Sequence, residues 1–259
     1  MFDHFMLLTG LGLSLLLAYT AFLFNWVQLS SVATIIIIGT IVLGFGGWYL
    51  AIGLVIFFAG SSLLTQLKIN GNKTLEHQSR NIYLDEDLRR DSYQVWANGF
   101  WVSVFCILFF LLNSDLFLIA AFAAIAAAAA DTWATEVGIR KAGKTKKITD
   151  FTPVEPGTDG GISLMGSLGA LGGAFSVASV LLISDFQASS QLFSVVLISG
   201  FLGCVADSYF GVFIKNNSVI KKMVNPDLPL NEHSLKNNVV NWLATGCAGL
   251  TAILFTQLF

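Results

Sequence analysis

Long apolar runs alternate with shorter polar segments along the whole chain. Each run is close to the roughly 20 residues that a helix needs to cross the hydrocarbon core of a bilayer. Eight such runs predict an all-α, polytopic membrane helix bundle of seven or eight transmembrane helices, forming a single transmembrane domain over residues 1–259. The predicted spans are Phe5–Phe24, Leu29–Phe45, Trp48–Leu67, Val95–Asn113, Asp115–Gly138, Gly161–Ser184, Ser190–Phe213 and Asn238–Phe259.

The second and third spans share one unbroken apolar stretch. Only the glycine-rich segment Gly44–Gly47 supplies a turn between them. Two interpretations therefore stay open at this point: two separate spans, or one long helix with a kink. With eight spans both termini lie on the same side of the membrane, and a count of seven moves only the N-terminus.

The composition supports a membrane protein. Hydrophobic residues make up 55% of the chain, charged residues only 12%, and the mean hydropathy is +0.73. Soluble domains carry about 25% charged residues, so the composition argues against a soluble protein. The first apolar run has no basic segment before it, and we therefore expect no cleaved signal peptide.

The basic residues predict how the chain is oriented. All 14 lysines and arginines fall between spans, in three segments at about 68–94, 139–160 and 214–237. Loops rich in Lys and Arg stay on the cytoplasmic side of a membrane. Because two spans separate each basic segment from the next, all three are expected on that side. The sequence thus predicts a polar cytoplasmic face on a protein of a prokaryotic-type plasma membrane or an organelle membrane.

Three acidic residues lie within predicted spans. Asp131 and Glu136 are in the fifth span and Asp207 is in the seventh. Ionisable groups inside a membrane are costly and are candidates for function. Both spans run toward the cytoplasmic side, so Asp131 and Asp207 are expected at one depth. The alternative is that the flanking small residues pack helices together and that neighbouring polar groups satisfy each acid.

A glycine-rich segment, Pro156–Ser163, precedes the sixth span. Glycines at the start of a helix free backbone N–H groups to face an anion. Gly157, Thr158, Gly160, Gly161 and Ser163 are therefore candidates for binding phosphate, and Asp159 for binding a metal or a ribose hydroxyl. The alternative is a tight turn leading into a packing helix, in which Gly169 and Gly173 form a GxxxG pair.

Residues Gly138–Thr145 match the phosphate-binding P-loop pattern letter by letter. That loop requires a strand before it and a helix after it. Here a predicted membrane helix precedes the motif, so we interpret the match as accidental. Lys144 remains a candidate for contacting phosphate as a point charge.

Two further polar clusters stand at the starts of predicted spans. Arg89, Arg90 and Asn98 form one, and Asn238 and Asn241 form the other. Arginines there suit phosphate binding but also serve as topology anchors. Asparagine oxygens beside acids suit a hydrated Mg²⁺ ion and its phosphates. Acids for a metal, cations for phosphates and an adjoining apolar bundle together favour phosphoryl transfer to a lipid.

The motifs also resemble a known family. The segments Asp131–Gly138, Pro156–Ser163 and Ala206–Gly211, with Gln94–Gly99, resemble the family first named domain of unknown function 92. That family includes transmembrane protein 19 and the phytyl-phosphate kinase of tocopherol synthesis. The resemblance implies a Mg²⁺-dependent membrane kinase that converts an isoprenoid monophosphate to its diphosphate with a nucleoside triphosphate.

A fainter similarity to CTP-dependent phytol and dolichol kinases rests on Asp131, Ala134 and Gly138, and it makes CTP a plausible donor. On this hypothesis Asp131, Glu136 and Asp207 are catalytic, and Asp131, Asp159 and Asp207 bind the metal. The nucleotide and phosphate ligands are Arg89, Arg90, Asn98, Lys144, Gly157, Thr158, Gly160, Gly161, Ser163, Asn238 and Asn241.

Two rival functions stay open. A membrane cytidylyltransferase acting on a lipid phosphate would share the nucleotide site but release pyrophosphate. A transporter would place polar residues through the full depth of the bilayer, whereas here they gather at one side. The expected partners are the membrane, the lipid and the nucleotide, with no nucleic acid, and a homo-oligomer is left open.

Overall fold

The computed structural model describes residues 4–72, 89–140, 144–187, 189–215 and 232–258. Most of these residues are helical. The helices are α1 (His4–Leu23), α2 (Val32–Asn72), α4 (Ser92–Leu112), α5 (Asp115–Arg140), α6 (Leu164–Ala178), α7 (Ser189–Lys215) and α9 (Glu232–Thr256), with short 3₁₀ turns η1 (Leu29–Ser31) and η2 (Ser179–Ile183). Two short strands, β1 (Lys146–Lys147) and β2 (Gly161–Ile162), complete the fold.

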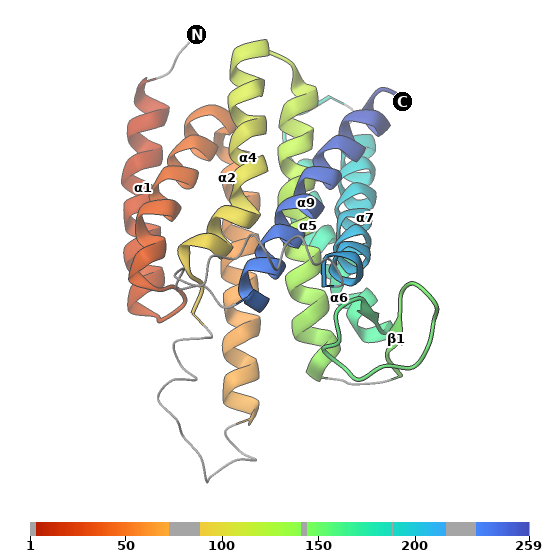
Figure 1. Ribbon diagram of the computed structural model, residues 1–259. Coiled ribbons are helices and arrows are strands. Elements are labelled where there is room, and N and C mark those ends of the chain that lie inside the picture. The colour runs from red at the N-terminus through yellow and green to blue at the C-terminus, as the bar shows by residue number, and fades with distance from the viewer. Residues whose placement is uncertain (1–3, 73–88, 141–143, 188, 216–231, 259) are drawn as a thin grey trace.

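Seven helices in the described parts of the chain are long and apolar enough to cross a membrane. The predicted all-α membrane bundle is therefore confirmed. Helix α2 is two helical halves joined at Gly47, whose φ of 79° is open to glycine but costly for other residues. Near the C-terminal end of α2, the Gln66 amide donates a 2.9 Å hydrogen bond to the Phe24 carbonyl, just after α1. Both ends of α2 thus lie at one end of the bundle (Figure 1). The two halves of α2 therefore cross the bundle once each, as predicted for two separate spans.

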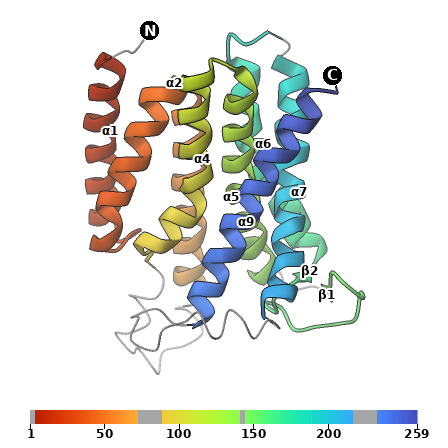
Figure 2. The same cartoon turned by 45° about the horizontal axis from the view of Figure 1, so that its top comes forward.

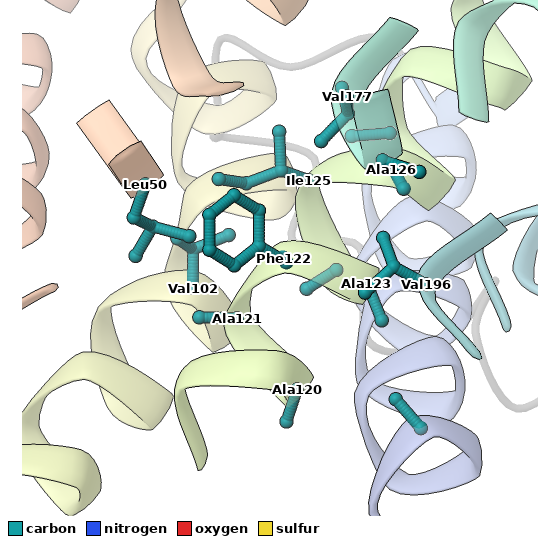
Figure 3. Packing of buried hydrophobic residues seen from close by; sticks show 14 of the residues in the cluster. Leu50, Val102, Ala120, Ala121, Phe122, Ala123, Ile125, Ala126, Val177 and Val196 are labelled. Atoms are coloured by element: carbon teal, nitrogen blue, oxygen red, sulfur yellow. The ribbon is translucent and has the colours of Figure 1, made fainter. Parts of the chain in front are cut away.

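Helix α5 is the centre of the bundle (Figures 1 and 2), in contact with α2, α4, α6, α7 and α9. Its alanine-rich stretch from Ala120 to Ala130 is buried throughout. Small side chains let neighbouring helices approach closely, and the resulting van der Waals packing is one of the forces that hold helices together inside a membrane. Figure 3 shows the one large ring of this stretch, Phe122, packed beside Leu50, Val102 and Ile125. The core therefore positions α5 rigidly, and with it the acids near its end.

Glycines let α6 pack directly against the backbone of α5. A Cβ atom added at Gly173 would lie 2.5 Å from the Ala129 carbonyl oxygen, and one at Gly169 would lie 2.6 Å from the Trp133 carbonyl oxygen. Neither position has room for a side chain, so the interpretation of Gly169 and Gly173 as a packing pair is confirmed.

Substitution of Gly173 by valine is expected to destabilise the bundle. The added atoms must push α6 away from α5, at a cost of about 1–3 kcal/mol for an overpacked core. The measurement is the thermal unfolding midpoint in detergent. Gly172→Ala is the matched control, because its Cβ would meet the Trp133 ring at an ordinary 3.7 Å. Equal midpoints for Gly173→Val and the wild type would contradict the close contact between these helices.

The segment between α5 and α6 differs from the prediction. Strands β1 and β2 pair antiparallel, with Lys147 opposite Gly161, and α6 begins only at Leu164. The predicted span began at Gly161, because apolar character does not distinguish a strand from a helix start. Helix α5 precedes the P-loop-like sequence and β1 follows it, an order opposite to the strand–loop–helix of a true P-loop. The match is therefore accidental, as expected.

The helix ends that flank the three basic segments lie at one end of the bundle (Figures 1 and 2). These are the ends of α2, α5 and α7 and the starts of α4, α6 and α9. Helix α9 begins at Glu232, six residues before the predicted Asn238, since its first turns are polar and extend the helix beyond the apolar span. Of the basic residues used for orientation, Lys73, Arg80, Lys141, Lys221 and Lys222 lie outside the described residues.

Candidate functional site

A cavity of about 710 Å³ opens at this end of the bundle. All the helices except α1 contribute to its wall, together with the segment before α6. Most of the predicted site residues line it: Arg90, Asn98, Asp131, Glu136, Gly157, Thr158, Asp159, Gly160, Gly161, Ser163, Asp207 and Asn241. Arg89, Lys144 and Asn238 are not part of its lining; Lys144 is exposed, whereas Asn238 is buried. Residues that are far apart in sequence thus converge on one polar chamber.

Asp131 and Asp207 meet inside this chamber. Their carboxyl groups lie within hydrogen-bonding reach of each other, which places the acids of α5 and α7 at matched depth. Asp159 is close enough for its charge to act on Asp207. Gly211 on α7 lies beside this segment, since a Cβ at that position would be in ordinary contact with the Asp159 Cβ at 3.8 Å. The three acids predicted as metal ligands therefore occupy one side of the cavity.

Several buried polar atoms around the cavity have no hydrogen-bond partner within the described part of the chain. They are Asp207 Oδ1, Asn241 Oδ1 and both amide atoms of Asn238, a residue only 6% exposed. Buried polar atoms are normally paired, and leaving one unpaired costs about 1–3 kcal/mol. Carboxylate and amide oxygens are the ligands that Mg²⁺ prefers, so these atoms fit a bound cation or its water. In the described residues no three His, Cys, Asp or Glu side chains gather as a preformed metal cluster, which leaves the Asp131–Asp207 pair with amide oxygens as the fitting donor set.

Arg90 is fixed in place by its own backbone. Its N–H donates to the Trp26 carbonyl (3.2 Å), and its carbonyl accepts from the Gln28 N–H (3.0 Å) and the Ser31 hydroxyl (2.6 Å). The guanidinium lies over the Phe57 ring at 5.4 Å. Burial lowers the pKa of Arg90 to about 10, and the charge of Glu136 opposes that shift. Arg90 therefore keeps its positive charge at neutral pH, with a backbone that does not depend on its side chain.

Glu136 stands apart from the pair of aspartates. It lies five residues after Asp131, which turns it by about 140° around the helix axis. Its Oε1 accepts a 2.9 Å hydrogen bond from the Thr65 hydroxyl on α2. Glu136 is buried between Thr65 and Arg90, and it is placed to orient the Arg90 guanidinium rather than to join the pair of aspartates.

The glycine-rich segment forms the outer wall of the cavity. Gly157 and Gly160 adopt φ values of 86° and 73°, which favour glycine. The Gly161 N–H donates to the Thr158 carbonyl at 2.8 Å, and the Ser163 hydroxyl accepts from the Gly166 N–H to cap α6. The Gly161 N–H and the Ser163 hydroxyl are thus engaged within the turn itself, and the segment shapes the cavity through its backbone.

Some cavity residues were missed by sequence reasoning. Thr65 lies in an apolar run that gave no signal of function, and Thr145 is the last residue of the P-loop-like motif that was set aside. Lys236 was counted only as a topology marker, yet it lines the cavity because α9 starts before it. Lys236 lies one helical turn before Val240, another cavity residue, and nothing in the sequence marked Val240 as part of a site.

Comparisons with known proteins agree with this architecture. The family model described as "Integral membrane protein DUF92" matches residues 12–249. The uncharacterized membrane protein MJ0933 of Methanocaldococcus jannaschii is 31% identical over 84% of this chain and 81% of its own length. Protein PGR of Arabidopsis thaliana is 28% identical over 44% of this chain and 46% of its own length. No solved structure matches. The chain belongs to the DUF92 family of integral membrane proteins.

Proposed function

We propose that this protein is a membrane kinase that transfers a phosphoryl group from a nucleoside triphosphate, CTP among the candidates, to an isoprenoid monophosphate. The observation that carries the proposal is the contact of Asp131 with Asp207 in a cavity that also holds Arg90. Paired acids to hold Mg²⁺ and a cation to hold phosphate are the parts that phosphoryl transfer requires. On the positive-inside rule the cavity faces the cytoplasm, where nucleotides are.

Each group has a role in this scheme. Asp131 and Asp207, with Asp159 nearby, would hold Mg²⁺, and the ion would neutralise charge on the transferring phosphoryl group. Arg90 binds phosphate, with Lys236, Arg89 and Lys144 adding positive charge around the entrance. The remaining predicted ligands, Asn98, Asn238, Asn241 and Gly157–Ser163, shape the nucleotide site.

The reaction needs no strong base. A phosphate monoester is largely ionised at neutral pH, since its second pKa is about 6. An oxygen of the acceptor phosphate forms a bond to the γ-phosphorus, the bond from that phosphorus to the β–γ bridging oxygen breaks, and the nucleoside diphosphate leaves. Glu136 is thus a positioning group for Arg90 and not a proton acceptor.

Purified protein in detergent with Mg²⁺, phytyl or geranylgeranyl monophosphate and each γ-labelled nucleoside triphosphate is expected to give a labelled prenyl diphosphate. The donor that transfers its label is the natural one. Release of labelled pyrophosphate with a nucleotidyl lipid product would instead identify a cytidylyltransferase. No transfer from any donor by folded protein would overturn the kinase proposal and favour transport.

A further inference from the structure

The cavity does not reach equally deep along all helices. Helix α7 lines it from Phe201 to Ile214, which is about 20 Å along a helix axis. Helix α5 lines it only from Asp131 to Ile139, about 12 Å, and α9 only from Lys236 to Asn241, about 8 Å. The innermost part of the cavity is therefore a single limb along α7, on the bilayer side of the acids.

This limb changes character with depth. Cys204 lies close enough to Asp131 and Asp207 for both of their charges to act on its thiol. Phe201 and Val205 complete the limb on α7. We call Phe201, Cys204 and Val205 the inner recess. It begins one turn from the acid pair and is apolar, whereas the part of the cavity above the pair is polar.

We propose that the inner recess takes the first isoprene units of the acceptor lipid, an inference that rests on the proposed function. With the hydrocarbon along Phe201 and Val205, the phosphate is held at the level of Asp131 and Asp207. An isoprenoid phosphate carries bare hydrocarbon directly after its phosphate, which matches apolar walls. A glycerophospholipid carries ester carbonyls there, and burying these without a hydrogen-bond partner costs free energy. The recess therefore selects single-chain isoprenoid phosphates.

A second hollow is an alternative binding place for the hydrocarbon of the lipid. Its volume is about 490 Å³, and Gly60, Trp133, Val137 and Gly172 are among the residues that line it. Its lining comes from α2, α5 and α6, and neither Asp131 nor Asp207 is part of it. A lipid in this hollow would therefore have its phosphate away from the acid pair.

The test compares two tryptophan substitutions on α7. Val205→Trp fills the recess, whereas Leu202→Trp lies at nearly the same depth but does not line the cavity and is 39% exposed. We expect Val205→Trp to lower kcat/KM for geranylgeranyl monophosphate at least 10-fold and Leu202→Trp to leave it within twofold. Binding of the nucleoside triphosphate, measured by equilibrium dialysis, should be unchanged in both, which also shows that both are folded.

A second measurement separates failure of this inference from failure of the kinase proposal. Prenyl monophosphate carrying a diazirine on its first isoprene unit is expected to crosslink to the α7 segment around Val205 in the wild type, and not in Val205→Trp. This binding readout holds whether or not phosphoryl transfer occurs. Two outcomes would overturn the recess and leave the kinase proposal standing. One is full activity of Val205→Trp. The other is crosslinking confined to Trp133, together with loss of activity in Gly172→Leu. Should Val205→Trp not fold, Phe201→Ala replaces it, with an expected shift of preference toward bulkier acceptors; an unchanged preference would refute the recess.

Discussion

Asp131→Asn is expected to lower the turnover of prenyl-phosphate phosphorylation by about 10³-fold, in the range seen when one transition-state electrostatic contact is removed. The substitution keeps the shape of the side chain and removes one of the two negative charges that would hold Mg²⁺. Two carboxylates in contact repel each other unless a cation or a proton lies between them. The variant should therefore fold at least as well as the wild type, while the Mg²⁺ concentration needed for half-maximal rate rises. The measurements are the rate as a function of Mg²⁺ and the unfolding midpoint in detergent.

The control for this prediction is Asp185→Asn. Asp185 is another aspartate; it accepts a 2.9 Å hydrogen bond from the Tyr49 hydroxyl and is not part of the cavity lining. The Asp185→Asn substitution should leave the rate and the Mg²⁺ dependence unchanged. Retained activity in Asp131→Asn would refute the assignment of Asp131 to the metal, whatever the function of the cavity proves to be.

Much of this site could be predicted because the sequence shows both the helical spacing of the acids and their depth within the predicted spans. Asp131 and Asp207 sit at similar distances from the polar ends of spans that run in the same direction. A helix of fixed rise per residue then places them at one level, and the contact follows once α5 and α7 pack. The same reasoning located the turn between the two halves of α2, where glycines interrupt an apolar run and Gly47 takes a positive φ.

Other features depend on contacts that no local pattern encodes. The β1–β2 pair joins Lys147 to Gly161 across a segment with no strand signal. Thr65 matters only because α2 brings it to Glu136, which is 71 residues away in the chain. Arg89 and Arg90 are equivalent in sequence, yet the bonds of the Arg90 backbone to Trp26, Gln28 and Ser31 decide which of them lines the cavity. Those partners lie in the segment between α1 and α2, which the sequence analysis did not single out; the predicted second span even included Ser31.

Arg90→Ala is expected to reduce kcat/KM for the nucleoside triphosphate by about 10- to 100-fold. A hydrogen bond to a charged partner contributes roughly 1.5–3 kcal/mol, and each 1.36 kcal/mol is a factor of ten in rate. The fold should survive, because the Trp26 and Ser31 contacts use the Arg90 backbone. Lys146→Ala is the control, since Lys146 is exposed in β1 and does not line the cavity. A loss in Lys146→Ala as large as in Arg90→Ala would show that the effect is general electrostatic attraction.

The pH dependence of Arg90→Lys separates a phosphate-binding role from a structural one. The pKa of Arg90 is about 10, and a cation loses its charge as the pH rises through its pKa, so Arg90 holds phosphate up to about that pH. Lysine starts from an ordinary pKa of about 10.4, below that of arginine, and the same burial lowers it further. The alkaline decline of kcat/KM should therefore begin at a lower pH in Arg90→Lys than in the wild type, while the unfolding midpoint at neutral pH stays the same. Coincident alkaline limbs would mean that the charge at position 90 does not act on the phosphates, and the cation of the site would then have to be Lys236.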